Sequence, residues 1–225
     1  MGTSTLGLDI ARHASIRAGV PTVFVSLDLT AAEMVNRLLC AEGSIDSQRL
    51  GRGRLDERDW ARMTRTLGCI ADAPLIIDAS PTLTVAELTA TCRHVRERHG
   101  LGLVVVDEVS AVQLSRPVGD SERNHEVVRS LKLLARELAM PVVALSRVAV
   151  GWRADRRPML ADLTEVERHT ADLVVLVDRP ELDDPWSPRR GEADLWVAKH
   201  RAGPTGALTV TFQGQYRRFA PMASP

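Results

Sequence analysis

The segment Leu101–Asp107 (LGLVVVD) is apolar at almost every position and ends in a carboxylate. A strand with one face in water alternates apolar and polar residues, whereas a strand in a parallel sheet is covered by helices on both faces and stays apolar. The run therefore predicts a buried parallel strand and restricts the chain to folds that layer helices over a sheet. A carboxylate at the end of such a strand is costly unless it meets a metal ion or a hydrogen-bond donor.

Other short apolar runs alternate along the chain with segments of helical periodicity. Further strands are predicted at Thr22–Leu27, Pro74–Asp78, Pro141–Ser146 and Ala171–Val177, and a terminal antiparallel pair at Asp194–Lys199 and Ala207–Phe212. Helices are predicted over residues 5–18, from Thr30 to about Cys40, over Asp56–Ile70, from Thr84 to Gly100 and over about 122–139. This alternation predicts an α/β fold, with a mainly parallel sheet flanked by helices and a C-terminal antiparallel hairpin.

Composition narrows the class of protein. Lys and Arg together number 29, as do Asp and Glu, so the formal net charge is zero and only a local basic patch is left for binding a polyanion. The three cysteines (Cys40, Cys69 and Cys92) are scattered, which favours reduced thiols over a metal site, and the histidines have no ligand-like spacing. No apolar run approaches the roughly 20 residues of a membrane span, and no signal peptide is evident, so we expect a cytoplasmic protein with no membrane partner.

Four segments give the chain a more specific likeness. MGTST before a helix resembles the end of a phosphate-binding P-loop, and FVSLDLT resembles a strand that carries a catalytic carboxylate. LVVVDE resembles a Walker B strand, and AKHRAGPTG resembles a hairpin that carries basic residues. In this order the segments are similar to the RecA-like, C-terminal ATPase domain of DnaB-type replicative DNA helicases. The resemblance covers nearly the whole chain, so residues 1–225 are expected to form a single RecA-like helicase motor domain.

The resemblance implies an ATP and Mg²⁺ site at the start of the first helix. In a P-loop, backbone N–H groups and a helix N-terminus hold the phosphates, a lysine neutralises them and a Ser or Thr hydroxyl holds the metal. Gly2, Thr3, Ser4 and Thr5 would therefore bind nucleotide, Ser4 would be a ligand of the metal, and Asp107 would hold the metal through water. Thr3 stands at the lysine position, so the P-loop is degenerate, and we expect a loss of roughly 3–4 kcal/mol in transition-state stabilisation. The alternative is that GTST only caps a helix.

The resemblance also implies a buried central strand before the P-loop, and the sequence begins inside the loop. The first strand is therefore expected to be missing and the domain to be truncated at its N-terminus relative to the family. Either the natural start lies upstream of Met1, or the chain lacks the strand and its sheet has a gap or is repaired by another segment. We favour the first interpretation, because a missing central strand leaves backbone groups unpaired on its neighbours.

Three residues are candidates for catalysis by the same resemblance. Asp28 stands where the family has its catalytic glutamate, so the carboxylate is retained but is one methylene shorter. The alternative is an exposed Asp before a helix. Glu108 follows Asp107 and either compensates for Asp28 or faces solvent. Arg147 ends the strand of Pro141–Ser146, where the family has a glutamine that senses the γ-phosphate. It either restores the positive charge lost at Thr3 or is a solvated loop residue.

Two basic segments are candidates for binding partners. Residues 147–157 carry four Arg and one Asp, and basic side chains with an aromatic ring suit single-stranded DNA. The candidate DNA-binding residues are Trp152, Arg153, Arg156 and Arg157. An Arg-Glu-Ser-Gly run that the family has beyond them is absent here, so a solvated loop is the alternative. Lys199 and Arg201 match the trans-acting fingers that reach a neighbouring subunit's ATP, which implies a ring of subunits, and the alternative is an exposed basic pair.

Two functions follow as hypotheses. The first is an ATP-dependent 5'-3' DNA helicase domain acting in DNA replication, with weakened ATP hydrolysis and with single-stranded DNA in the channel of a homo-hexameric ring. The second is a catalytically inactive DnaB-like homologue that serves as a nucleotide- or helicase-binding module. The family's N-terminal domain and linker helix are not found in this sequence, so association with another helicase subunit is an alternative to a ring of its own.

Overall fold

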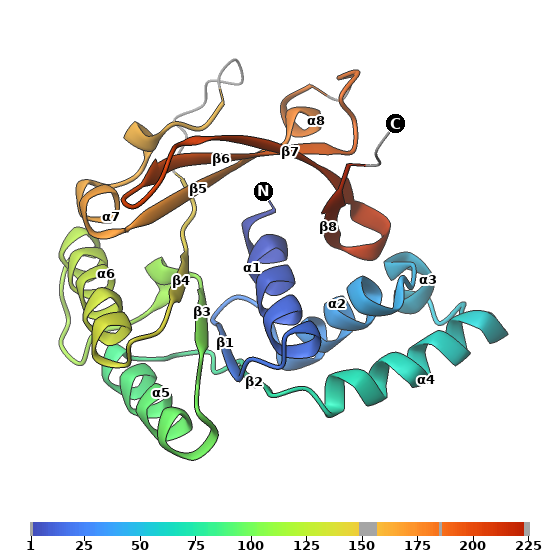
Figure 1. Ribbon diagram of the computed structural model, residues 1–225, viewed down its shortest axis with the longest axis horizontal. Helices are drawn as coiled ribbons and strands as arrows, with labels where there is room; N and C mark the ends of the chain where they lie inside the picture. The colour runs from blue at the N-terminus through green and yellow to red at the C-terminus, as the bar shows by residue number, and fades with distance from the viewer. Residues whose placement is uncertain (1, 149–156, 185, 223–225) are drawn as a thin grey trace.

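The computed structural model describes residues 2–148, 157–184 and 186–222, which form two sheets and the helices around them (Figure 1). The helices are α1 (Thr3–Arg12), α2 (Ala31–Gly43), α3 (Ser47–Gly51), α4 (Glu57–Ala71), α5 (Val85–His99), α6 (Asp120–Glu137), α7 (Glu165–Thr170) and α8 (Pro180–Asp183). The strands are β1 (Thr22–Ser26), β2 (Leu75–Asp78), β3 (Leu103–Asp107), β4 (Val142–Leu145), β5 (Leu173–Asp178), β6 (Glu192–His200), β7 (Gly206–Gln213) and β8 (Arg218–Pro221). Short π or 3-10 turns are η1 (His13–Arg17), η2 (Val109–Ala111), η3 (Leu160–Asp162) and η4 (Gly214–Tyr216).

The first sheet is parallel, with strand order β2-β1-β3-β4. Every residue of β3 is buried, as its apolar sequence predicts. Val104 and Val106 pack into a cluster with residues of α5 and α6, whereas Val105 packs on the opposite face with Phe24 and with Leu8 of α1. Helices therefore cover both faces, and the predicted parallel α/β core is confirmed.

Local signals set the helix ends where the sequence predicts them. Thr30 with Glu33 and Thr84 with Glu87 form capping boxes at the starts of α2 and α5. Gly100 ends α5 with φ of 67°, in the left-handed region that favours glycine. None of the helices in the described ranges is long and apolar enough to cross a membrane.

The second sheet is antiparallel, with strand order β5-β6-β7-β8. The predicted terminal hairpin is confirmed as β6 and β7 but is only part of this sheet. The strand predicted at Ala171–Val177 does not extend the parallel sheet, because β5 pairs antiparallel with β6. It follows that the chain has more antiparallel structure than the sequence pattern indicates.

Helices α1 and α6 connect the two sheets. Helix α6 packs on β4, and its Lys132 forms an ion pair with Asp172 immediately before β5. Helix α1 begins beside the ends of β3 and β5, since Ser4 bonds Asp107 and a Cβ on Gly2 would lie 3.6 Å from Val177 Cγ1. Within the described residues no strand precedes α1, β4 pairs only with β3, and β5 pairs only with β6. In the described part of the chain β4 and β5 therefore each lie at an edge of their sheet.

Open edges should exchange their amide protons faster than the middle of the sheet. We expect the amides of β4 that point away from β3 to show protection factors at least about tenfold lower than those of β3, because solvent reaches them without disrupting the core. Hydrogen exchange followed by NMR measures this at single residues, and amides of β3 are the internal control. Equal protection of Val142, Ala144 and the β3 residues would show that the outer edge of β4 is covered.

Candidate nucleotide-binding site

The N-terminus of α1 presents free backbone donors. Gly2 precedes the helix with φ of 117°, a conformation that only glycine adopts at low cost. A Cβ at this position would lie 3.3 Å from Phe219 Cζ, so the close approach also favours glycine. No side chain caps the helix and its first turn has no acidic residue. The N–H groups of Thr3, Ser4 and Thr5 have no partner within the helix, and the helix dipole adds partial positive charge, so this end attracts an anion.

Asp107 lies beside this helix end. Ser4 Oγ donates to Asp107 Oδ1 over 3.1 Å, although the two residues are far apart in the sequence. Asp107 is only 3% exposed, and its Oδ2 atom is buried without a hydrogen-bond partner. Burial is the main cause that raises the pKa of Asp107. The hydrogen bond from Ser4 opposes that rise, while the charges of Asp28 and Glu108 add to it.

These two residues fit a magnesium ion. Mg²⁺ takes oxygen ligands and is held in proteins by one or two side chains together with phosphate oxygens and water. The unpartnered Oδ2 of Asp107 and the hydroxyl of Ser4 are such ligands, next to a helix end that attracts phosphate. No cluster of three or more His, Cys, Asp or Glu side chains that would form an all-protein cage occurs in the described part of the chain. The arrangement would suit a metal shared between these residues and a phosphate ligand.

The three catalytic candidates come together at the carboxyl ends of β1, β3 and β4. Arg147 Nη2 lies 3.0 Å from Asp28 Oδ2, and Arg147 Nε lies 2.6 Å from Glu108 Oε2. The side chains of Arg147 and Asp28 are 69% and 54% exposed, so both remain accessible to a ligand. The side chain of Glu108 is 13% exposed, so the alternative that it faces solvent is wrong.

Two further arginines lie at this site and were not predicted. Arg37 on α2 is partly buried, and burial lowers the pKa of its guanidinium. The charge of Arg217 acts in the same direction, whereas Asp107 and Asp28 are near enough to oppose the change. Arg37 stands three residues after Met34 on α2, and this helical spacing was the available signal.

Arg179 follows β5 and lies against Gly2. Its Cδ would be 3.5 Å from a Cβ on Gly2, and its guanidinium carbon lies 3.6 Å from the ring centre of Phe212. The side chain is 12% exposed and pairs with Glu181, but its Nε atom is buried without a hydrogen-bond partner. A cation at the carboxyl end of an apolar strand was the signal that could have identified it.

The residues predicted to bind DNA or a neighbouring subunit lie away from the Ser4 site. Lys199 Nζ donates to the carbonyls of Arg168 and His169 at the end of α7, over 2.6 and 3.2 Å. Arg201 pairs with Asp172 at 3.3 Å, so both predicted fingers lie over residues 168–172 and not at Ser4. Arg157 stacks on Trp196, with its guanidinium carbon 4.0 Å from the ring centre. The other DNA-binding candidates (Trp152, Arg153 and Arg156) lie outside the described residues.

A parallel sheet flanked by helices, with a free helix end facing a buried carboxylate, defines a nucleotide-binding domain of the RecA-like ATPase class. Residues 1–221 match the family described as DnaB-like helicase C terminal domain. The chain therefore belongs to this family.

Individual relatives agree with this assignment. The chain is 45% identical to a replicative DNA helicase DnaB of Leifsonia xyli, over 99% of the chain and 50% of the relative. It is 43% identical to the corresponding helicase of Mycobacterium intracellulare, over 98% of the chain and 39% of the relative. The chain thus spans about half the length of these relatives or less.

Solved structures show the same fold. One of them, described as an ATPase domain, matches with a TM-score of 0.92 and 26% identity, over 99% of this chain and 81% of that one. A DnaB-like replicative helicase studied with primase matches with the same TM-score and identity, over 99% of this chain and 55% of that one.

Proposed function

We propose that this chain is an ATP-binding motor domain of a DnaB-type DNA helicase acting in replication, with weakened ATP hydrolysis. The observation that carries the proposal is the contact of Ser4 with Asp107, whose second carboxylate oxygen is buried and unpartnered at the free end of α1. The names of the relatives, replicative DNA helicases, support the cellular context.

Each residue of the proposed site has a separate role. Backbone N–H groups of Thr3, Ser4 and Thr5 would bind the phosphates, and Ser4 and Asp107 would hold Mg²⁺. When bound, the metal neutralises phosphate charge. Asp28 orients and deprotonates the attacking water, and Glu108 is the second carboxylate placed for that role through its shared contact with Arg147.

Arg147 is proposed to supply part of the charge that a P-loop lysine would give. Replacing it by glutamine should weaken triphosphate affinity about tenfold, the value of one charge-assisted hydrogen bond. Titration with a fluorescent ATP analogue measures this, and Arg129→Gln, an exposed arginine on α6, is the matched control. Unchanged affinity in Arg147→Gln would remove Arg147 from the nucleotide site.

Single-stranded DNA and a ring of subunits are the partners we propose. Arg157 and its neighbours in 147–157 supply the positive charge for a DNA backbone. The exposed Arg201 and the partly buried Lys199 would contact another subunit. Their present contacts with residues 168–172 use backbone carbonyls and one carboxylate, which an incoming phosphate can replace.

A second candidate function, a binding module without turnover, is favoured by Thr3. A threonine carries no charge, and Arg147 already neutralises two carboxylates. ATP hydrolysis by the wild-type chain, with and without single-stranded DNA, separates the two. Turnover that DNA stimulates supports the motor. Nucleotide binding with turnover at the background rate supports the module, and the absence of nucleotide binding contradicts the motor and leaves only a module that binds another helicase subunit.

A further inference from the structure

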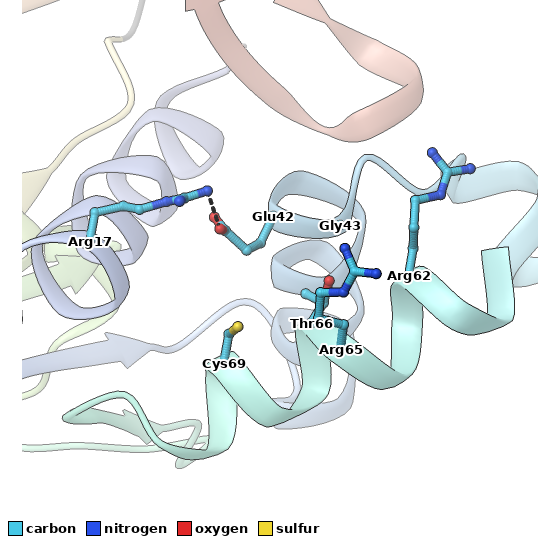
Figure 2. A pocket seen from close by; sticks show the side chains of 7 residues that line it. All are labelled: Arg17, Glu42, Gly43, Arg62, Arg65, Thr66 and Cys69. Atoms are coloured by element: carbon cyan, nitrogen blue, oxygen red, sulfur yellow. Dashed lines mark ion pairs between the residues drawn. The ribbon is translucent and has the colours of Figure 1, made fainter. Parts of the chain in front are cut away.

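A cavity of about 300 Å³ lies between η1, the C-terminal end of α2 and α4, away from the Ser4 site. Figure 2 shows Arg17 reaching in from η1 on one side, with Arg62 and Arg65 on α4 on the other. Helices α2 and α4 approach closely here because Gly43 has no side chain, and a Cβ there would lie 2.8 Å from Thr66 Oγ1. The walls are therefore rigid helices rather than loops.

The cavity has more guanidinium groups than carboxylates. Its lining contains Arg17, Arg62 and Arg65 but a single carboxylate, Glu42. Glu42 is already shared, because it pairs with Arg12 at 2.5 Å as well as with Arg17.

A carboxylate beside the opposite wall is likewise shared between two arginines. Asp59, only 1% exposed, pairs with Arg62 at 2.6 Å and with Arg49 at 2.8 Å. Arg65 lies one turn further along α4 and has no ion-pair partner within the described ranges. Arg12 and Arg49 also pair with Asp9 and Asp56, so among the arginines of the lining it is Arg65 whose charge no ion pair within the described ranges neutralises.

We propose that this cavity binds the phosphoryl group of a small phosphate compound. Guanidinium groups bind phosphate oxygens through paired N–H donors, and the hydroxyl of Thr66 adds a further donor at the wall. The site is separate from the nucleotide site, since Thr3 to Arg17 form continuous helix of about 20 Å at 1.5 Å per residue. It also does not depend on the proposed motor function.

Cys69 provides a local probe for the test. It lines the cavity and is exposed, whereas Cys40 and Cys92 are buried. Bound phosphate covers the thiol and its negative charge disfavours the reactive thiolate. Saturating inorganic phosphate should therefore slow modification of the native protein by a thiol reagent at least about threefold, relative to chloride at equal ionic strength. Loss of the reaction in Cys69→Ser verifies that the reagent reports this site.

Variants of the lining locate the effect. Arg65→Ala and Arg17→Ala should each raise the phosphate concentration needed for half protection about tenfold, because each removes a charge-assisted contact. Arg58→Ala, an exposed arginine on α4 outside the lining, should behave as wild type. Adenosine monophosphate is a second ligand. Protection by both ligands indicates that a phosphate ester is accepted, whereas protection by inorganic phosphate alone indicates free phosphate.

Three results would overturn the proposal. The first is that neither ligand protects Cys69 in the wild type. The second is that protection is equal in wild type and Arg65→Ala. The third is that Asp107→Asn removes protection, which would mean that the anion acts from the nucleotide site. Protection that persists in Asp107→Asn while the variant fails to bind ATP would keep this site and the proposed motor function distinct.

Discussion

Replacing Asp107 by asparagine is expected to abolish magnesium-dependent ATP binding while leaving the fold intact. The amide retains the shape of the carboxylate but brings a neutral group where the metal requires an anionic oxygen. We expect affinity for the magnesium complex to fall by at least about 100-fold, since one ligand of a two-residue metal site is lost. Isothermal titration with a non-hydrolysable ATP analogue, with Mg²⁺ or with EDTA, measures the change.

The same substitution should stabilise the protein without ligand. Burial raises the pKa of Asp107, so the folded protein holds this proton more tightly than the unfolded chain does. The tighter binding of this proton contributes favourably to the free energy of unfolding. The contribution is complete below the pKa of the unfolded state, about 3.9, and is lost as the pH rises through the pKa of the folded state. At pH 7 the buried charge lowers stability, and Asp107→Asn should gain about 1 kcal/mol in the free energy of unfolding.

Urea denaturation at pH 7 and near pH 4 tests whether Asp107→Asn raises or lowers the free energy of unfolding. The advantage of Asp107→Asn should shrink at the lower pH, because protonation removes the charge of the buried wild-type carboxylate. Ser4→Ala is a useful comparison, because it removes the hydrogen bond that stabilises the ionised carboxylate. An asparagine variant that is less stable than wild type at pH 7 and binds the magnesium complex normally would contradict the role assigned to Asp107.

Replacing Thr3 by lysine is expected to increase ATP hydrolysis by roughly 100-fold, as the reverse of deleting one group that stabilises the transition state. Thr3 is the first residue of α1, one position before Ser4, so a lysine there projects from the helix end that binds phosphate. Thr3→Met, with a neutral side chain of similar length, is the control. If wild type hydrolyses ATP rapidly and Thr3→Lys does not increase the rate, another cation already stabilises the transition state. Arg179 is the cation that lies nearest to Gly2.

The core of the fold was predictable because its signals are local. The apolar run of β3, the capping boxes of α2 and α5 and the glycine that ends α5 each depend on a few adjacent residues. The short helices α3 and α7 have too few turns for periodicity to identify them. The pairing of β5 with β6 depends on which strands are available as neighbours, and an apolar run alone does not distinguish parallel from antiparallel partners.

The site was predictable only in part, because some of its side chains are placed by tertiary packing and not by local sequence. Gly2, Ser4, Asp28 and Arg147 were identified through the resemblance to the helicase family, whereas Asp107 was also indicated by its place at the end of a buried apolar strand. Arg37 and Arg179 were missed because long side chains reach the site from positions whose direction depends on tertiary packing.

A structure with Mg²⁺ and a non-hydrolysable ATP analogue tests the central claim most directly. We expect the phosphates over the first turn of α1, with the metal bound by Ser4 Oγ and by the now partnered Oδ2 atom of Asp107. A nucleotide bound elsewhere, with Asp107 Oδ2 still unpartnered, would contradict it.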